Sequence, residues 1–591
     1  MNLLKTKIIL TWKKAQQALP FFSIKRKRRF NHTEIDKKLV YILSPRKIPN
    51  GGQLKHLKKF LNPKENLIIK ICSLVIVINL IYLGISFLNK HLQYSPVAGG
   101  DYIEGVVGYP KTINPLYAVN RDIDSDLSRL IYSSLFKYDQ NGVLINDLAE
   151  NVTINNNQEY IIKIKENAKW QDGSRVTVDD VIFTIDAIKN SEYRSPLRTS
   201  LSSVAAERVD DWTIKLNLSS AYAPFLEVLT FGILPKNIWE NISPGSAALS
   251  ELNLKPVGSG PYEFKSLIKN KDGDLKEYNL VVNNDYYAIK PYIKNIKFKF
   301  FINYAEAIKS LNDNQIDGLG YLPFVERKEL LAKDSLSLNE LVRPQIISLF
   351  FNYNKDKALA DKVVRVSLAQ ALDKDQIIKD VFDGIYQRAD GPILKNNFVY
   401  NDQIKKYDYL PAEASQNIKN KLASTTLTVI DSGANVSVAA KIKSYWEQIG
   451  VIVELKIVPG ERAADIIKNR DFEILLYGES VGGDPDVYAF WHSSQVGGKG
   501  LNLAGYNNSE VDKLLMEARA TTNNEDRKIK YQKFQEIISE DIPTIFLYSP
   551  TYTYVQTKKI KGFNGTMIIE PADRFASIFN WHLKTNKKLI W

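Results

Sequence analysis

One run of apolar residues stands apart from every other in the chain. Leu67–Leu88 holds 22 residues with a single charge, Lys70. Because a helix rises about 1.5 Å per residue, roughly 20 apolar residues are needed to cross a hydrocarbon core of about 30 Å. A buried core helix would show a polar face and a shorter apolar run. The pattern therefore predicts a membrane-spanning helix over 67–88.

Beyond Asp101 the apolar positions follow two shorter periods. Tyr160–Ile164 and Trp212–Leu218 alternate apolar and polar residues, which is typical of half-buried strands. In Thr177–Lys189 an N-terminal hydroxyl with an acid three residues later precedes apolar residues at helical spacing. This part of the chain is therefore predicted to mix strands and helices.

The later part of the chain contains a predicted β-α-β unit, the building block of a parallel sheet. Leu427–Asp431 and Val451–Val458 read as strands and Val438–Gly450 as the helix between them. Asp361–Ile378 is predicted to be one helix, and Phe472–Tyr477 a strand that leads into a glycine-rich loop. The chain is thus predicted to be of the α/β class.

Charge is distributed very unevenly about the apolar run. Residues 1–66 hold 17 Lys and Arg against three acids, a net charge of +14, whereas the whole chain carries +13. The positive-inside rule then places the basic tail in the cytoplasm and the long segment after the span outside. Beside a span, we interpret the basic run as a topology signal that attracts anionic lipid, and we expect no nucleic-acid partner. The predicted location is the cell membrane, single-pass, with an extracellular or periplasmic domain.

Neither a cleaved signal peptide nor a disulfide is expected in this chain. The apolar run begins far from the N-terminus, so a cleaved signal peptide is not expected. Cys72 is the only cysteine, and it follows Ile69–Ile71 rather than the small residues of a lipidation site.

The external part, residues 101–591, is too long for one core and predicts two or three lobes. Residues 89–100 are predicted to be a juxtamembrane linker.

The residues available for catalysis outside the membrane are few. Only His492 and His582 could serve an external site, and no metal-ligand spacing or nucleotide-binding loop occurs, so no cofactor or metal is expected. Gly478–Gly482 matches the G-x-S-x-G pattern of a hydrolase, with Ser480 as nucleophile. A nucleophile elbow turns at once into a helix, whereas here the loop continues through Gly483–Pro485. We therefore expect a non-enzyme, with a serine hydrolase as the less favoured alternative.

The same glycine-rich loop is better suited to binding. Gly482 and Gly483 would let the backbone approach a ligand closely. Acids and aromatic residues flank them, and these could hold a cationic group such as a peptide amino terminus against apolar walls. The alternative is an acidic, solvated loop over a packed aromatic cluster. The flanking residues are Tyr477, Glu479, Asp484, Asp486, Tyr488, Phe490 and Trp491.

An ordered series of short motifs resembles the family 5 extracellular solute-binding proteins, the oligopeptide-, dipeptide- and nickel-binding components of ABC importers. Each motif is weak alone, and the ordered set is specific. Together the motifs cover about 101–591. They are Lys137–Asp139 with Gly142, Leu148–Glu150, Trp170–Gly173, Val176–Phe183, Pro256–Phe264, Gln315–Gly318, Phe351–Asn352, Asp361–Asp373, Asp484–Asp486, Gly505–Asn508 and Asp541–Pro543.

The resemblance implies a periplasmic-binding-protein-like fold, with two α/β lobes joined by a hinge and an inserted subdomain. Ligand would lie between the lobes and be passed to a permease in the membrane. The implied first lobe combines 101–136, 237–345 and 546–591, the inserted subdomain is 137–236, and the second lobe is 346–545. The implied cleft includes Asn120–Asp122 from the first lobe and Ser348–Phe351 from the second.

The chain departs from this family in two places. Peptide-binding members carry an aspartate where this chain has Val481, so Glu479, Asp484 or Asp486 would have to replace it. The uncleaved span stands where a signal or lipid anchor is usual. We expect a membrane-anchored binding protein that captures peptides or another small solute, with a ligand-sensing receptor as the alternative. The predicted ligand-binding residues are Asn120, Arg121, Asp122, Phe350, Tyr477, Gly478, Glu479, Ser480, Val481, Asp484, Asp486 and Trp491.

Overall fold

The computed structural model describes residue 55 and residues 61–331, 333–498 and 500–589. Most of the predicted basic tail, residues 1–54 and 56–60, lies outside the described residues. The chain divides into two compact units. The first comprises Met1–Tyr94 with Lys587–Trp591, and the second is Ser95–Asn586.

The first unit contains one long apolar helix, α5, which spans Pro63–His91. It covers the predicted 67–88, and it is the one helix of the described residues with the length and hydropathy to cross a membrane. Its apolar side chains are exposed, and its place in a membrane stays a prediction. The predicted linker 89–100 is not wholly irregular, because strand β1, Leu92–Val97, pairs with β21, Lys584–Leu589.

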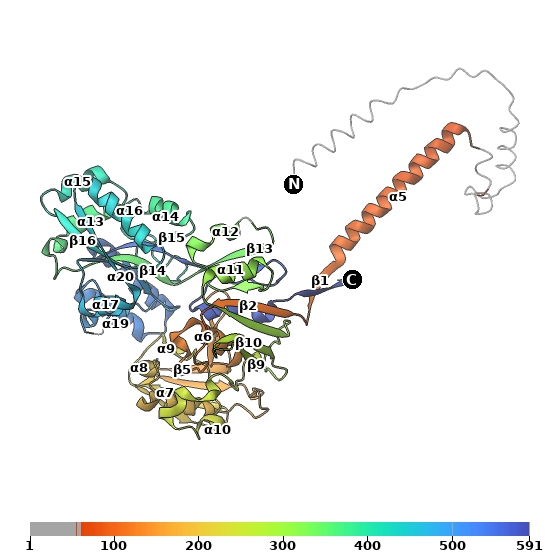
Figure 1. The fold of residues 1–591 in the computed structure, drawn as a ribbon, viewed down its shortest axis with the longest axis horizontal. Helices are drawn as coiled ribbons and strands as arrows, with labels where there is room; N and C mark the ends of the chain where they lie inside the picture. The colour runs from red at the N-terminus through yellow and green to blue at the C-terminus, as the bar shows by residue number, and fades with distance from the viewer. Residues whose placement is uncertain (1–54, 56–60, 332, 499, 590–591) are drawn as a thin grey trace, which may run out of the picture. The chain divides into compact units, whose positions relative to one another are not determined.

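The second unit contains two large sheets, which define two lobes (Figure 1). We call the part built on the seven-stranded sheet the first lobe. Its strand β2 runs parallel to β11. Helix α11 (Tyr304–Asn312) packs against the sheet at β2, and helix α6 (Asp122–Ile131) packs against it at β9. The strand order is β13 (Leu336–Val342), β20 (Thr551–Thr557), β12 (Gly318–Leu319), β2 (Asp101–Val107), β11 (Asn295–Phe301), β10 (Leu275–Val282) and β9 (Tyr262–Lys269).

A four-stranded antiparallel sheet shares the hydrophobic core of the first lobe. The predicted strands and the helix after Thr177 are confirmed here. The helix is α7, Val178–Lys189, and the Thr177 backbone N–H donates to the Asp180 carboxylate at 2.8 Å, as a capping box requires. The strands are β5 (Ala149–Asn155), β6 (Glu159–Ile164), β8 (Thr213–Leu218) and β7 (Val204–Arg208), with a hairpin of β3 (Phe136–Tyr138) and β4 (Leu144–Asn146) beside them.

The second lobe is built on a six-stranded sheet with a separate hydrophobic core on each face. The predicted β-α-β unit is confirmed, because β16 and β17 are parallel and α16, Asn435–Gln448, connects them. The strand order is β15 (Gln387–Arg388), β19 (Thr544–Ser549), β14 (Gln345–Phe351), β18 (Ile474–Ser480), β16 (Ser424–Ile430) and β17 (Ile452–Val458).

The predicted helix over Asp361–Ile378 is wrong in one respect, because two helices occupy this segment. α13 spans Lys362–Gln370 and α14 spans Lys374–Phe382. Asp373 breaks the run, since its carboxylate accepts the Gln376 N–H at 2.9 Å and starts a new helix. The other helices are α8 (Arg198–Leu201), α9 (Phe225–Val228), α10 (Lys236–Trp239), α12 (Lys328–Leu331), α15 (Pro411–Ile418), α17 (Ala463–Asn469), α18 (Tyr488–Trp491), α19 (Ser509–Ala520) and α20 (Asn524–Asp541).

The chain crosses between the two large sheets twice, each time directly from one strand to the next. β13 of the first lobe is followed by β14 of the second, and β19 of the second is followed by β20 of the first. Pro344 and Pro550 lie in these crossings, where their fixed φ limits the backbone. Two short connections of this kind are suited to act as a hinge. The residue boundaries predicted for the lobes stay a prediction.

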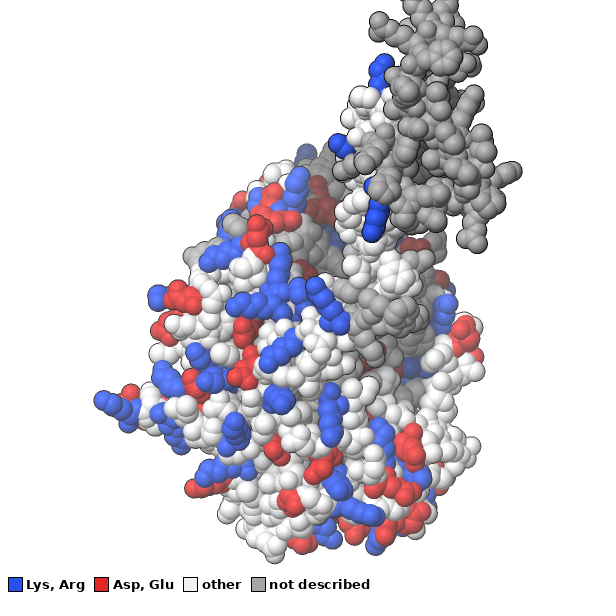
Figure 2. All heavy atoms as spheres, turned by 90° about the vertical axis from the view of Figure 1, so that its right-hand side faces the viewer, with Lys and Arg blue, Asp and Glu red and all other residues white. Residues whose placement is uncertain are grey.

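Figure 2 shows Lys and Arg interspersed with Asp and Glu over the face that it draws. Beyond residue 66 the net charge is about −1, which agrees with this mixture. A surface for nucleic acid would instead gather Lys and Arg on one face. The basic character of the chain therefore belongs to its N-terminal 66 residues.

Candidate functional site

A cavity of about 460 Å³ lies between the two lobes, beside the first crossing. The first lobe contributes the hairpin turn after β3, the end of β13 and a segment near the C-terminus. The second lobe contributes a loop after β15 and the glycine-rich loop. The lining residues are Asn141–Val143, Val342, Pro344, Ile393, Leu394, Asn396–Phe398, Val481–Pro485, Thr566 and Met567.

A second cavity of about 520 Å³ lies at the other edge of the crossings. Its wall contains several aromatic rings, and Tyr477 and Gly478 of β18 contribute to it. A Cβ added to Gly478 would lie 2.6 Å from the Gln345 side-chain nitrogen, so a larger residue here would require the Gln345 and Ile347 side chains to shift. The lining residues are Tyr321, Pro323–Val325, Arg343, Gln345, Ile347, Phe382, Tyr386, Ile430, Ser432–Asn435, Tyr477, Gly478, Tyr548 and Pro550.

The glycine-rich loop makes its close approach to the first lobe. A Cβ added to Gly483 would lie 2.9 Å from the Tyr138 ring and 3.0 Å from a carboxylate oxygen of Glu227. Gly482 has φ +70°, a conformation that glycine adopts without strain. The two glycines therefore let the backbone of the second lobe close against side chains of the first.

The loop acids Asp484 and Asp486 both have cationic partners within the second lobe. Arg527 lies 2.5 Å from Asp484, and Arg519 lies 2.8 Å from Asp486. Arg519 also lies over the rings of Tyr222 and Tyr488, at 5.0 and 4.1 Å. Because each acid is paired, neither offers an uncompensated negative charge to a ligand.

Contacts beside these ion pairs join the four-stranded part of the first lobe to the second lobe. The Ala223 N–H donates to the Arg519 carbonyl at 2.7 Å, and the Asn157 amide donates to the Ala520 carbonyl at 3.2 Å. The Thr522 hydroxyl donates to the Asn157 side chain at 2.6 Å. The two lobes thus touch on the side of the cleft away from the crossings.

Glu479 lies in β18 and is only 6% exposed. Within the described part of the chain its Oε1 has no hydrogen-bond partner, and the described cavities do not include it in their walls. Burial raises the pKa of its carboxyl well above the ordinary value. Burial therefore favours the protonated form of Glu479 in the core of the second lobe, and its predicted part in amine binding stays a prediction.

Glu479→Gln is expected to reduce the fall in stability with rising pH. Since the folded pKa is raised, the folded chain holds this proton more tightly than the unfolded chain, whose carboxyl has a pKa near 4.5. The stabilisation is therefore complete below that pH and is lost as the pH rises toward the folded pKa, by at most ~1.4 kcal/mol per pH unit. Urea unfolding of both chains over a pH series measures the difference. Parallel pH profiles would contradict a neutral Glu479.

The remaining predicted site residues separate into core and surface. Phe350 and Trp491 are buried in the same hydrophobic core of the second lobe, where Trp491 packs on the Phe546 ring. Both are therefore core residues. Ser480 is exposed at the end of β18, and the Val481 N–H donates to the Pro344 carbonyl at 2.8 Å.

The predicted segment Asn120–Asp122 lies at the start of α6. The Arg121 guanidinium donates to the Tyr109 carbonyl at 3.2 Å and lies 3.5 Å from Asp124, and Asp122 is exposed. The Asn120 side chain lies outside the described residues. Val119, immediately before this segment, lines a third cavity, together with α6 residues.

A serine hydrolase with Ser480 as nucleophile would need a general base beside that residue, and the described residues place neither His492 nor His582 in that role. β18 is followed by a loop, and the next helix begins only at Tyr488. His492 is hydrogen-bonded to Ser494 at 2.9 Å and its ring stacks on Tyr488, while His582 Nδ1 lies 2.9 Å from the Asn580 carbonyl oxygen. The arrangement suits binding rather than nucleophilic attack. No group of three or more His, Cys, Asp or Glu suited to a metal occurs in the described residues.

Sequence reasoning did not identify Tyr138 or Glu227. Tyr138 enters the sequence analysis only within the family motif Lys137–Asp139, and Glu227 lies in a helical turn with no distinctive pattern. Nothing local to either residue marks it, because its importance arises from the approach of a loop more than 250 positions away. Only the three-dimensional arrangement brings these residues to the cleft.

Comparison with known proteins gives a consistent picture over most of the chain. A sequence model of the family described as bacterial extracellular solute-binding proteins, family 5 Middle, matches residues 143–500. The oligopeptide-binding protein AppA of Bacillus subtilis is 28% identical over 496 residues, covering 79% of this chain and 89% of AppA. The probable D,D-dipeptide-binding periplasmic protein DdpA of Escherichia coli is 25% identical, covering 82% and 95%.

Solved structures share the fold. The structure of Bacillus subtilis AppA in complex with a nonapeptide matches with a TM-score of 0.66 at 26% identity, over 83% of this chain and all of that one. The ABC transporter substrate-binding protein CtaP of Listeria monocytogenes matches with a TM-score of 0.73 at 26% identity, over 82% and 99%. The periplasmic-binding-protein-like α/β fold predicted from the sequence is therefore confirmed.

Proposed function

This chain belongs to the family 5 bacterial extracellular solute-binding proteins, and we propose that it captures peptides between its lobes for an ABC-type importer while anchored in the membrane. The observation that carries the proposal is the cavity of about 460 Å³ whose walls come from both lobes. A ligand placed there would contact both lobes at once. It would therefore favour a closed arrangement over an open one, which is how ligand binding drives hinge closure.

Peptides are the ligand class that the relatives and the cleft favour together. AppA of Bacillus subtilis, one of the relatives, is an oligopeptide-binding protein, and its structure holds a nonapeptide. In this chain one interlobe cavity is lined by the glycine-rich loop and asparagine side chains, and the second cavity contributes aromatic rings. Such a surface can bind a peptide main chain through hydrogen bonds while it tolerates varied side chains.

Helix α5 supports the anchoring part of the proposal. It has the length and hydropathy of a single span, and the 17 Lys and Arg before residue 67 favour a cytoplasmic N-terminus. A tether keeps the binding domain near a permease in the same membrane and raises its effective concentration there. Protease added to spheroplasts, in which any outer membrane has been opened, should then digest the binding domain and spare the N-terminal tail. Protection of the binding domain in such cells would contradict this topology.

Thermal unfolding of the purified full chain tests peptide capture. Ligand that binds only the folded chain, at ~100 times its dissociation constant, should stabilise it by ~2.7 kcal/mol. Pools of random-sequence peptides, sorted by length, would be added to the chain in detergent micelles. A rise in the unfolding midpoint with at least one pool is expected. Unchanged midpoints with every pool, beside a rise with another solute class, would contradict the peptide assignment.

A further inference from the structure

A third cavity, of about 210 Å³, lies within the first lobe and is bounded by α6, α8 and α9. Its wall is rich in hydroxyl groups and contains two carboxyl groups, those of Glu227 and Glu570. The hydroxyl residues in the wall are Ser125, Ser128, Tyr132, Ser134, Ser200 and Thr230.

The charges around this cavity do not balance. Arg129 lines this cavity, and its guanidinium forms an ion pair with Asp573 at 2.5 Å. Across the cleft, Arg527 likewise forms an ion pair with Asp484. In the described part of the chain neither Glu227 nor Glu570 belongs to an ion pair within 4 Å, so the cavity has an excess of negative charge when both are ionised.

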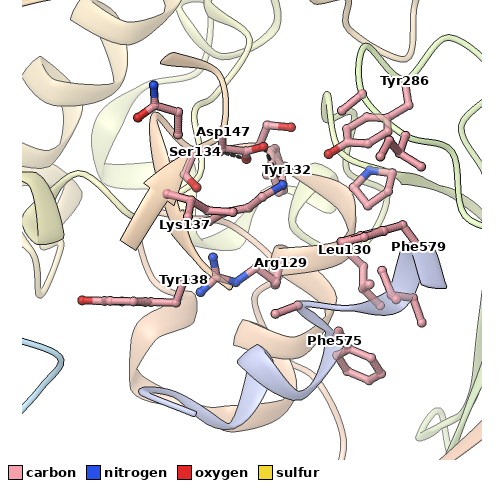
Figure 3. A pocket seen from close by; sticks show the side chains of 18 of the residues that line it. Arg129, Leu130, Tyr132, Ser134, Lys137, Tyr138, Asp147, Tyr286, Phe575 and Phe579 are labelled. Carbon is pink, nitrogen blue, oxygen red and sulfur yellow. Dashed lines mark hydrogen bonds and ion pairs between the residues drawn. The ribbon is translucent and has the colours of Figure 1, made fainter. Parts of the chain in front are cut away.

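Glu227 connects this cavity to the cleft between the lobes. It is half-buried, and Tyr138 and the backbone N–H of Asp484 hydrogen-bond to its carboxylate. Gly482 and Gly483 approach its two oxygens from the second lobe. In Figure 3, the Tyr138 side chain points away from the ion pair of Lys137 and Asp147. A carboxylate can accept about four hydrogen bonds, so two donors leave room for a ligand.

We propose that Glu227 recognises an ammonium group of the bound ligand, and that the cavity between α6 and α9 is the subsite for that group. This inference rests on the proposed function and adds the chemical class that the site selects. A primary ammonium brings one positive charge and three donors, which a carboxylate and neighbouring hydroxyl oxygens can accept. An anionic group would meet two carboxylates and be repelled. Neutral ends of a ligand would leave Glu227 unpaired.

The acid–base behaviour of Glu227 gives this inference a second readout. Burial, and then the charge of Asp484, raise the pKa of Glu227 to about 7, whereas Tyr138, the Asp484 N–H and Arg527 act in the opposite direction. Glu570 and Arg129 share its cavity. A bound ammonium stabilises the ionised form, so binding of amines should weaken as the pH falls below about 7 and Glu227 takes up a proton.

The test compares free and N-acetylated peptides on the full chain held in detergent micelles. One pool of random-sequence peptides is offered with its amino termini free, and a second pool after N-acetylation, and retained peptides are counted by mass spectrometry. The wild-type chain should retain the free pool roughly ten- to hundredfold more strongly, the usual strength of a charge-assisted hydrogen bond. Glu227→Gln, which keeps an acceptor for the Asp484 N–H, should retain both pools equally. Glu240→Gln, at an exposed acid outside the cavity walls, should behave as wild type.

Lowering the pH from about 7 to about 5.5 should weaken retention of the free pool by the wild-type chain and leave the acetylated pool unaffected, because peptide amino groups stay charged over this range while Glu227 takes up a proton. This measurement needs no variant and so holds even if Glu227→Gln does not fold. Equal retention of both pools by the wild-type chain, or a preference that survives in Glu227→Gln, would overturn the inference and leave peptide capture standing. Retention of neither pool would overturn peptide capture itself, and this inference with it.

Discussion

Arg574→Met is expected to destabilise the first lobe by about 3–5 kcal/mol, the usual cost of leaving buried charges without their partner. Arg574 is 2% exposed and pairs with Glu104 at 3.0 Å and Asp126 at 2.5 Å. Both acids are themselves no more than 2% exposed. Methionine fills much of the same volume, so the loss reports mainly the two unpaired carboxylates. Denaturant unfolding followed by circular dichroism measures it.

The matched control removes an exposed arginine. Arg208 is paired with Asp179 and Asp211 at the surface, where a pair contributes about 0–1 kcal/mol. Arg208→Met should therefore change the free energy of unfolding little. Adding Glu104→Gln and Asp126→Asn to Arg574→Met should restore part of the loss, because the buried charges are then gone. Equal effects of the two single variants would contradict the buried network.

Gly258→Ala is expected to cost about 3 kcal/mol, at the upper end for overpacking, because the added atom meets backbone. Its Cβ would lie 2.0 Å from the Ile131 carbonyl oxygen at the end of α6. That oxygen cannot move freely, since it accepts the Gly260 N–H at 2.7 Å and the Gln171 side chain at 3.3 Å. The glycine is therefore required by a close approach of two backbones.

Gly245→Ala provides the control for this substitution. A Cβ there meets nothing within 4 Å, so the change should stay within about 0.5 kcal/mol of the wild type, as is usual for surface positions. Thermal unfolding of both variants in the same micelles separates a general glycine effect from the clash. A midpoint for Gly258→Ala equal to that of Gly245→Ala would show that α6 can shift to make room.

The elements that the sequence predicted well are those whose pattern is local. The apolar helix over 67–88, the capping box at Thr177 and the β-α-β unit at 427–458 each follow from local residue spacing. The helix over 361–378 was predicted without its break, because the apolar positions continue through Asp373 while its capping hydrogen bond interrupts the helix. Capping and periodicity compete there, and capping prevails.

The candidate site was predicted only in part, for a different physical reason. Val481, Gly482, Gly483 and Asp484 line the interlobe cavity, as the glycine-rich loop suggested. The sequence around Asp484 could not show that its carboxylate is paired, because its partner Arg527 lies on α20, 43 positions away. Glu227 gave no local signal at all. Charge pairing across the fold decides which acid is available, and no spacing rule encodes it.

Mass spectrometry of the small molecules released by denaturing the full chain, purified gently from its own membranes, tests the central claim most directly. A binding protein with a cleft closed by contacts from both lobes should retain ligand through purification, because opening must precede release. We expect the released molecules to be peptides with free amino termini, in near-stoichiometric amount, and we expect fewer of them from Glu227→Gln. A stoichiometric solute of another class, with no peptides, would contradict it.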